Sequence, residues 1–271
     1  RFESHPAQST YLIALTAATK SKLTTRLEAH LARYVQTLKA TKVDMKRIGV
    51  LQPVHAFPDL INSLLVMSVG RVPYVHDTCG AITSALMAFI ESAAVLNTKY
   101  ADVIRIANLS FIEHFLASKV SQSETLRTYL KRTSQMKEEA SLRYVDWMIA
   151  YEFPQFANLC ARITEVREQV RSDELALYVR RHDVATVVTE TDTRKVDAAV
   201  KEMFKRLEKH FGATDVADLE LRSDMWTRIR TVFSERLGNL AASAEASYRL
   251  TLKCDTTYSE KTFLSYERNF I

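Results

Sequence analysis

The residues that most often carry chemistry are spread through this chain at spacings that match no common active-site motif. No histidine follows a glutamate by three positions and no two histidines are four residues apart, so neither a di-iron helical site nor a zinc protease site is expected. The glycines are isolated, which excludes glycine-rich phosphate-binding loops, and no Gly-x-Ser-x-Gly sequence occurs. The residues concerned are His5, His30, His55, His76, His114, His182, His210, Gly49, Gly70, Gly80, Gly212 and Gly238.

A site assembled from distant residues is the enzymatic alternative that the motifs leave open. Regular helix faces leave little room for a pocket, so we expect no enzyme, cofactor, metal or small-molecule substrate. His30 and His210 flank apolar stripes and are interpreted as structural residues. Cys79, Cys160 and Cys254 are odd in number, far apart and without a Cys-x-x-Cys pair. This argues against a disulfide framework and fits a reducing cytosol.

The composition indicates long helices. Hydrophobic residues make up 47% of the chain and charged residues 25%, as in ordinary globular proteins. There are only 5 glycines and 5 prolines, and every proline lies within residues 1–154. A chain with so few turn-forming residues must have long elements, which are typically helices. The longest uncharged apolar run, 79–90, is too short to span a membrane.

Apolar residues recur at three- and four-residue spacing, which predicts amphipathic helices. The segment 74–119 is either one helix or two joined near Asn97, and 187–193, which is β-branched and polar, is predicted to be a connection. We expect Trp147 and Trp226 inside the bundles. The predicted helices cover 7–48, 59–69, 74–119, 121–153, 155–170, 173–186, 195–211, a last long one from 215 past 244, and a docked short helix within 256–271.

The expected fold class is therefore all-α, an elongated rod of stacked antiparallel helical bundles. The first bundle covers 1–154 and the C-terminal bundle 155–271, with the boundary placed between 154 and 193.

Two surface features are candidates for contact with other molecules. Lys201, Lys205 and Lys209 recur every four residues with Arg194 and Arg206 nearby, and this basic ridge suits an anionic membrane or an acidic partner. The alternative is a solvated face, because Glu202 and Glu208 dilute the charge. Nucleic acid is not expected, since most aromatic residues fall on apolar stripes. Candidate partner contacts near the C terminus are Phe263, Leu264, Tyr266 and Phe270.

Several segments resemble one family in order and spacing over roughly residues 12–252. The sequence KYADVIRIANLSFIEHF, at 99–115, resembles the segment of exocyst component 1 proteins built around a Lys-Tyr-Ala-Asp-Val-Val/Ile-Arg core, although Ile106, Ala107 and Asn108 keep the following pattern only in part. EFPQFANLCARITEV, at 152–166, is similar to a helix start in that family. KVDAAVKEMFKRLEKHF, at 195–211, with DMWTRIRTVFSERL, at 224–237, resembles the family's last helix pair. The tail 258–271 departs from it.

The resemblance implies a non-catalytic, C-terminal helical piece of an exocyst subunit that tethers secretory vesicles to the plasma membrane during exocytosis. The partners it implies are other exocyst subunits, and the location is the cytoplasm, with recruitment to sites of secretion. The family's lipid- and GTPase-binding module lies at the N terminus, and we expect this chain to lack it. The alternatives are a scaffold or adaptor of another tethering complex, or a helical enzyme with a site not visible in sequence.

Overall fold

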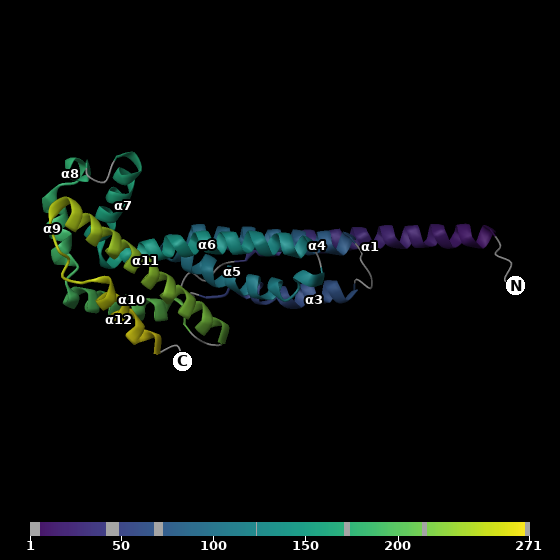
Figure 1. The fold of residues 1–271 in the computed structure, drawn as a ribbon. Helices are drawn as coiled ribbons and strands as arrows, with labels where there is room; N and C mark the ends of the chain where they lie inside the picture. Colours follow the sequence, from purple (N-terminus) through teal and green to yellow (C-terminus); the bar gives the residue numbers. More distant parts are fainter. Residues whose placement is uncertain are drawn as a thin grey trace.

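The chain forms an elongated, all-helical rod, as the sequence predicts (Figure 1). The computed structural model describes residues 6–41, 49–67, 73–122, 124–170, 174–212 and 216–268, and within these ranges every regular element is a helix. The elements are α1 Pro6–Ala40, α2 Gln52–His55, α3 Phe57–Met67, α4 Pro73–Leu96, η1 Thr98–Tyr100, α5 Ala101–Ala117, η2 Val120–Gln122, α6 Glu124–Glu152, α7 Pro154–Gln169, α8 Leu175–Tyr178, α9 Arg181–Glu190, α10 Thr193–His210, α11 Val216–Tyr248 and α12 Thr256–Glu267.

Helices α1, α3, α4, α5 and α6 form the shaft of the rod, and α5 packs along both α4 and α6. The first half of α1 extends beyond the other helices (Figure 1), where Tyr11, Leu12 and Ile13 are exposed. Along the predicted apolar stripe of α1, Leu27, Leu31 and Tyr34 are partly buried against the first core, and Leu38 is buried within it. The predicted continuation of this helix to residue 48 lies outside the described residues.

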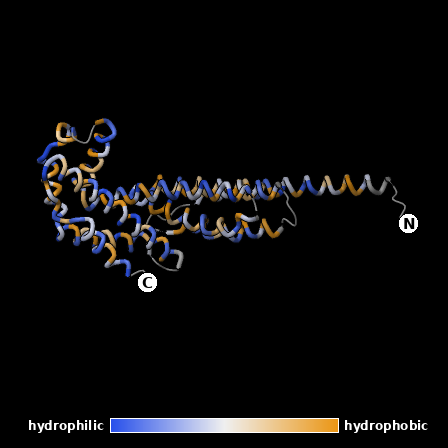
Figure 2. Tube along the Cα trace, viewed as in Figure 1, coloured by the Kyte–Doolittle hydropathy of each residue, from blue (hydrophilic) through white to orange (hydrophobic). Residues whose placement is uncertain are grey.

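Helix α4 is the central helix of the shaft. It ends at Leu96 and α5 begins at Ala101, so the segment predicted as one helix or two is two, joined through Asn97 and η1. By length and composition alone, Tyr74–Leu96 is the one described helix apolar enough to cross a membrane, and 56% of its apolar window is buried in the fold. Its buried residues pack against α3, α5 and α6. The helix is therefore apolar because it lies in the core of the shaft. Figure 2 shows hydrophobic and hydrophilic residues alternating along the shaft.

The second hydrophobic core lies where α7 to α12 gather around the end of α6 (Figure 1). Its centre is Trp226 of α11, which is fully buried as predicted. Helix α6 contributes to both cores, since Leu126 belongs to the first and Met148 and Ile149 to the second. The break predicted at Pro154 is confirmed as the start of α7, where the missing amide hydrogen costs no helical hydrogen bond.

The connection predicted at 187–193 is wrong. Residues 187–190 are the last turn of α9, and Val187 and Val188 are buried in the second core. β-Branched residues lose some side-chain freedom in a helix, but burial of their apolar surface outweighs this small cost. The actual connection is only Thr191 and Asp192, and the side chain of Asp192 caps α10 by accepting from the Lys195 N–H at 3.0 Å.

The docked short helix expected in the tail is present as α12. Asp255 caps it by accepting from the Tyr258 N–H at 2.7 Å, and Phe263 packs between Trp226 and Phe233 of α11. Residue 215, the predicted start of the last long helix, and the tail residue Phe270 lie outside the described residues.

Candidate interaction surface

The basic ridge predicted on α10 is exposed, but one of its five members is half-buried against α6. The buried side of α10 carries Val196, Val200, Met203 and Leu207, which confirms the predicted stripe. On the opposite side Arg194, Lys201, Lys205 and Lys209 are exposed, and Lys205 forms an ion pair with Glu202 at 2.6 Å. The remaining candidate, Arg206, is one position past Lys205 and is therefore rotated about 100° around the helix.

Arg206 lies against the end of α6. It forms an ion pair with Glu152, and its guanidinium carbon lies 3.9 Å from the ring centroid of Tyr151 and 5.8 Å from that of Trp147. Such stacking is attractive because the negative ring face meets a delocalised cation. Arg206 therefore joins α10 to α6 and contributes less than the lysines to an open basic ridge.

Trp147 does not pack inside the bundle as predicted. It is 40% exposed, and Tyr151, one turn later, is 59% exposed. The two ring centroids are 5.6 Å apart. The core side of α6 instead consists of Tyr144, Val145, Met148 and Ile149, so the apolar sequence pattern is wider than the buried stripe. The extra aromatic residues lie on the surface beside α10.

Two exposed lysines lie near His210, whose ring contacts that of Trp147. Lys209 of α10 and Lys99 of η1 are both close enough to His210 to lower the pKa of its imidazole, as does Arg206. The Lys99 Nζ also lies 5.1 Å from the ring centroid of Tyr100. We define the α6–α10 aromatic patch as the surface formed by Lys99, Trp147, Tyr151, Arg206 and Lys209.

Beneath this patch lies His210, interpreted from the sequence as structural. It is 6% exposed, and its Nδ1 lies 3.0 Å from the hydroxyl oxygen of Tyr144. Burial, strengthened by the cations above, lowers the pKa of His210 to about 4, and burial raises the pKa of Tyr144. At neutral pH both groups are uncharged, and the Tyr144 hydroxyl can donate to an unprotonated Nδ1. The pair supports the rings of Trp147 and Tyr100, which contact His210 at centroid distances of 5.8 and 5.5 Å.

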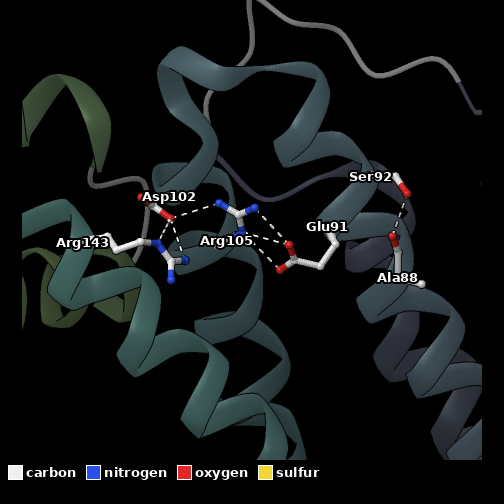
Figure 3. A network of polar contacts seen from close by, with 6 residues as sticks. All are labelled: Ala88, Glu91, Ser92, Asp102, Arg105 and Arg143. Carbon is white, nitrogen blue, oxygen red and sulfur yellow. Dashed lines mark hydrogen bonds and ion pairs between the residues drawn. The ribbon is translucent and has the colours of Figure 1, made fainter. Parts of the chain in front are cut away.

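The other charged cluster of the shaft ties three helices together. Arg105 of α5 bonds to Glu91 of α4 and to Asp102, each at 3.0 Å, and Arg143 of α6 bonds to the same Asp102 at 2.9 Å (Figure 3). An open hollow beside these residues is lined by Glu91, Arg105, Met136, Glu139 and Arg143. Because its carboxylates and guanidinium groups largely neutralise one another, the cluster is suited to fixing helix positions.

The three cysteine thiols are buried. Burial raises the pKa of the thiols of Cys79 and Cys254 to about 11 and that of Cys160 to about 12, so all three are protonated and poor nucleophiles at neutral pH. All three cysteines are free. Within the described part of the chain, no group of three or more His, Cys, Asp or Glu side chains is placed to hold a metal ion.

The candidate contact residues of the tail occupy different environments. Phe263 is fully buried in the chain's own core, and Tyr266 is half-buried with its ring centroid 5.0 Å from that of Phe204. Leu264 is 45% exposed. Of the three described residues, Leu264 therefore presents the open apolar surface, and Phe263 is a core residue because α12 docks on α11.

Comparison with known proteins gives two matches, both to one exocyst subunit. A family model described as "Exocyst complex component Sec3, C-terminal" matches residues 2–249. Exocyst complex component SEC3A of Arabidopsis thaliana is 20% identical over 220 residues, which are 79% of this chain and 24% of the relative. The chain thus spans about a quarter of the length of the curated relative it matches. No solved structure matches. The expected resemblance is confirmed at the level of an exocyst subunit, and the subunit that the matches name is Sec3.

Proposed function

Because this chain belongs to the family of C-terminal regions of exocyst complex component Sec3, we propose that it is a helical tethering segment of the exocyst. In this proposal it acts in the cytoplasm, is recruited to the plasma membrane at sites of secretion, and helps to hold secretory vesicles there before fusion. The observation that carries the proposal is the family match across residues 2–249, which includes the whole shaft and most of the second core.

Such a segment would act by setting the distance between other proteins. Helices α6 and α11 contain 29 and 33 residues, so each is about 44–50 Å long at 1.5 Å per residue. Since α6 belongs to both hydrophobic cores, it joins them without a flexible linker. A stiff rod of this kind sets a distance and presents helix faces to other subunits.

We propose that the segment acts without catalysis. The groups that a helical enzyme would use have structural roles. The thiols are buried and protonated, His210 is held neutral beside Tyr144, and the charges around Arg105 pair with one another. Binding to other exocyst subunits is therefore the activity to test first. A scaffold of another tethering complex is the alternative with the same architecture.

Affinity purification of the full-length protein, with identification of the proteins that copurify, tests this function. We expect the other exocyst subunits in the eluate. If they are absent and a different large helical complex is recovered, the chain belongs to another tethering complex. Small-angle scattering of the isolated chain should also show an elongated particle, whereas a compact globule would contradict a spacing role.

The basic ridge supports a second, peripheral contact with anionic membrane. Arg194, Lys201, Lys205 and Lys209 are exposed along α10, and each lysine near an anionic surface contributes about 1 kcal/mol. Cosedimentation with phosphatidylserine vesicles should fall when Lys201, Lys205 and Lys209 are changed together to Glu. Unchanged sedimentation would leave the ridge as a solvated face.

A further inference from the structure

We propose that the α6–α10 aromatic patch binds an acidic protein segment that also carries apolar side chains. The patch combines two exposed aromatic rings, Trp147 and Tyr151, with the cations Lys99, Arg206 and Lys209. The inference rests on the proposed function only in placing that segment on another subunit of the complex.

The aromatic half of the patch has the composition of an interface centre. Tryptophan, tyrosine and arginine are the residues that most often dominate binding energy in protein interfaces. Trp147 and Tyr151 lie side by side and leave much of their surface open to water, and adjacent exposed apolar side chains with a polar rim are typical of interaction sites. Tyr144 and His210 support the Trp147 ring from below, so it is held in place before a partner arrives.

The charged half of the patch selects an acidic partner. Glu152 is paired with Arg206 and is largely buried. None of the ion pairs in the described ranges includes Lys99 or Lys209, although both side chains are exposed. Burial is the main reason that the pKa of His210 is lowered, and the positive charges of Arg206, Lys209 and Lys99 add to that shift. A partner carboxylate placed there would meet positive charge without displacing an existing pair.

Geometry favours a protein segment over a membrane surface. The guanidinium group of Arg206 stacks on the ring of Tyr151, and the ring of Trp147 packs against His210, so both rings are held at the protein surface. The patch offers only two open lysines, and because attraction to an anionic membrane grows with the number of basic residues near its surface, two give little membrane affinity. A segment with carboxylates and an apolar side chain uses both halves of the patch at once.

A peptide titration of the intact chain tests the patch directly. The probe is a dye-labelled helical peptide with leucines on one face and glutamates elsewhere, and its affinity is measured by fluorescence anisotropy at low salt. We expect saturable binding that protects Trp147 from acrylamide, a clear signal because the other tryptophan, Trp226, is buried. The same peptide with lysines in place of the glutamates should bind at least about tenfold more weakly.

Matched variants identify the surface. Lys99→Glu with Lys209→Glu should weaken binding at least about tenfold, and Trp147→Ala should do the same by removing the aromatic anchor. The control, Lys131→Glu with Arg132→Glu, makes the same charge change on exposed residues of α6, about 22 Å along the helix from Trp147. It should bind within about twofold of the unaltered chain.

Three results would overturn the inference: no binding of the acidic peptide, equal loss in the control variant, or binding of phosphatidylserine vesicles through the same residues without peptide binding. The proposed function is tested apart from this. If the unaltered full-length protein still copurifies with exocyst subunits while the peptide fails to bind, the proposed tethering function is supported and the inference about the patch is rejected.

Discussion

The side-chain oxygen of Asn108 accepts a hydrogen bond of 2.7 Å from the backbone N–H of Leu51, across 57 residues of sequence. Its amide nitrogen donates to the carbonyl oxygen of Gly49 at 3.1 Å and to that of Ile104 at 2.7 Å. Asn108 is fully buried in α5, and Gly49 has a φ of 139°, which favours glycine. One side chain thus satisfies two backbone groups of the connection before α2 and fixes that connection against the shaft.

Replacing Asn108 with leucine should destabilise the fold by about 1–3 kcal/mol, because the Leu51 N–H and the Gly49 carbonyl would lose a buried partner. Urea unfolding followed by circular dichroism measures the change. The matched control is Asn239→Ala, an exposed asparagine in α11, for which we expect a change within about 0.5 kcal/mol. Equal stability of the two variants would mean that water replaces the bonds of Asn108.

The neutral His210 predicts a specific loss of stability in mild acid. Burial, Arg206, Lys209 and Lys99 lower its pKa from an ordinary value of 6.5 to about 4. Between these values the unfolded chain binds a proton that the folded chain does not, so this contribution to stability is complete above pH 6.5 and is lost as the pH falls toward 4.

His210→Gln should reduce this pH dependence, because glutamine does not titrate and can still accept a hydrogen bond from Tyr144. The measurement compares the loss of Tm between about pH 7 and about pH 5 in the two proteins. His30→Gln, at an exposed position of α1, is the control and should behave as the unaltered chain. An identical pH profile for His210→Gln would show that His210 is not the titrating group.

Docking of α12 depends on the contact between Phe263 and Trp226. Their ring centroids are 4.9 Å apart, and the indole N–H of Trp226 donates to the Phe263 carbonyl oxygen at 3.2 Å. Phe263→Ala should cost about 3–5 kcal/mol and shift the emission of Trp226 to the red as water enters. Leu264→Ala, at the adjacent exposed position, should stay within about 0.5 kcal/mol. If both variants unfold alike, α12 contributes little to the core.

The helices of this rod were predictable because their apolar stripes repeat with the helical period. Val196, Val200, Met203 and Leu207 are all fully buried, as their spacing indicates. The pattern failed at Val187, where local propensity favoured a connection and burial in the second core favoured a helix. Sequence periodicity records which side of a helix is apolar, but it does not record how much of that side a neighbour covers.

The candidate surface was only partly predictable for the same reason. The exposure of the ridge lysines on one face could be predicted, because they recur every four residues on a single helix. The α6–α10 aromatic patch could not, since Trp147 and Arg206 come from helices far apart in the sequence and meet only in the fold. The exposed position of Trp147 had one visible signal: Val145, Met148 and Ile149 already supply a complete apolar stripe without it.

The division into bundles at 1–154 and 155–271 remains a prediction, and the shared helix α6 makes it testable. Tyr144, Met148 and Ile149 are buried in the second core although they precede residue 154. A fragment covering 155–271 would lose these neighbours and expose their apolar contacts, so we expect weak, non-cooperative unfolding and binding of the dye ANS. A fragment covering 124–271, which keeps all of α6, should unfold cooperatively. If the shorter fragment proves equally cooperative, the second bundle is independent of α6 and the boundary lies at 154.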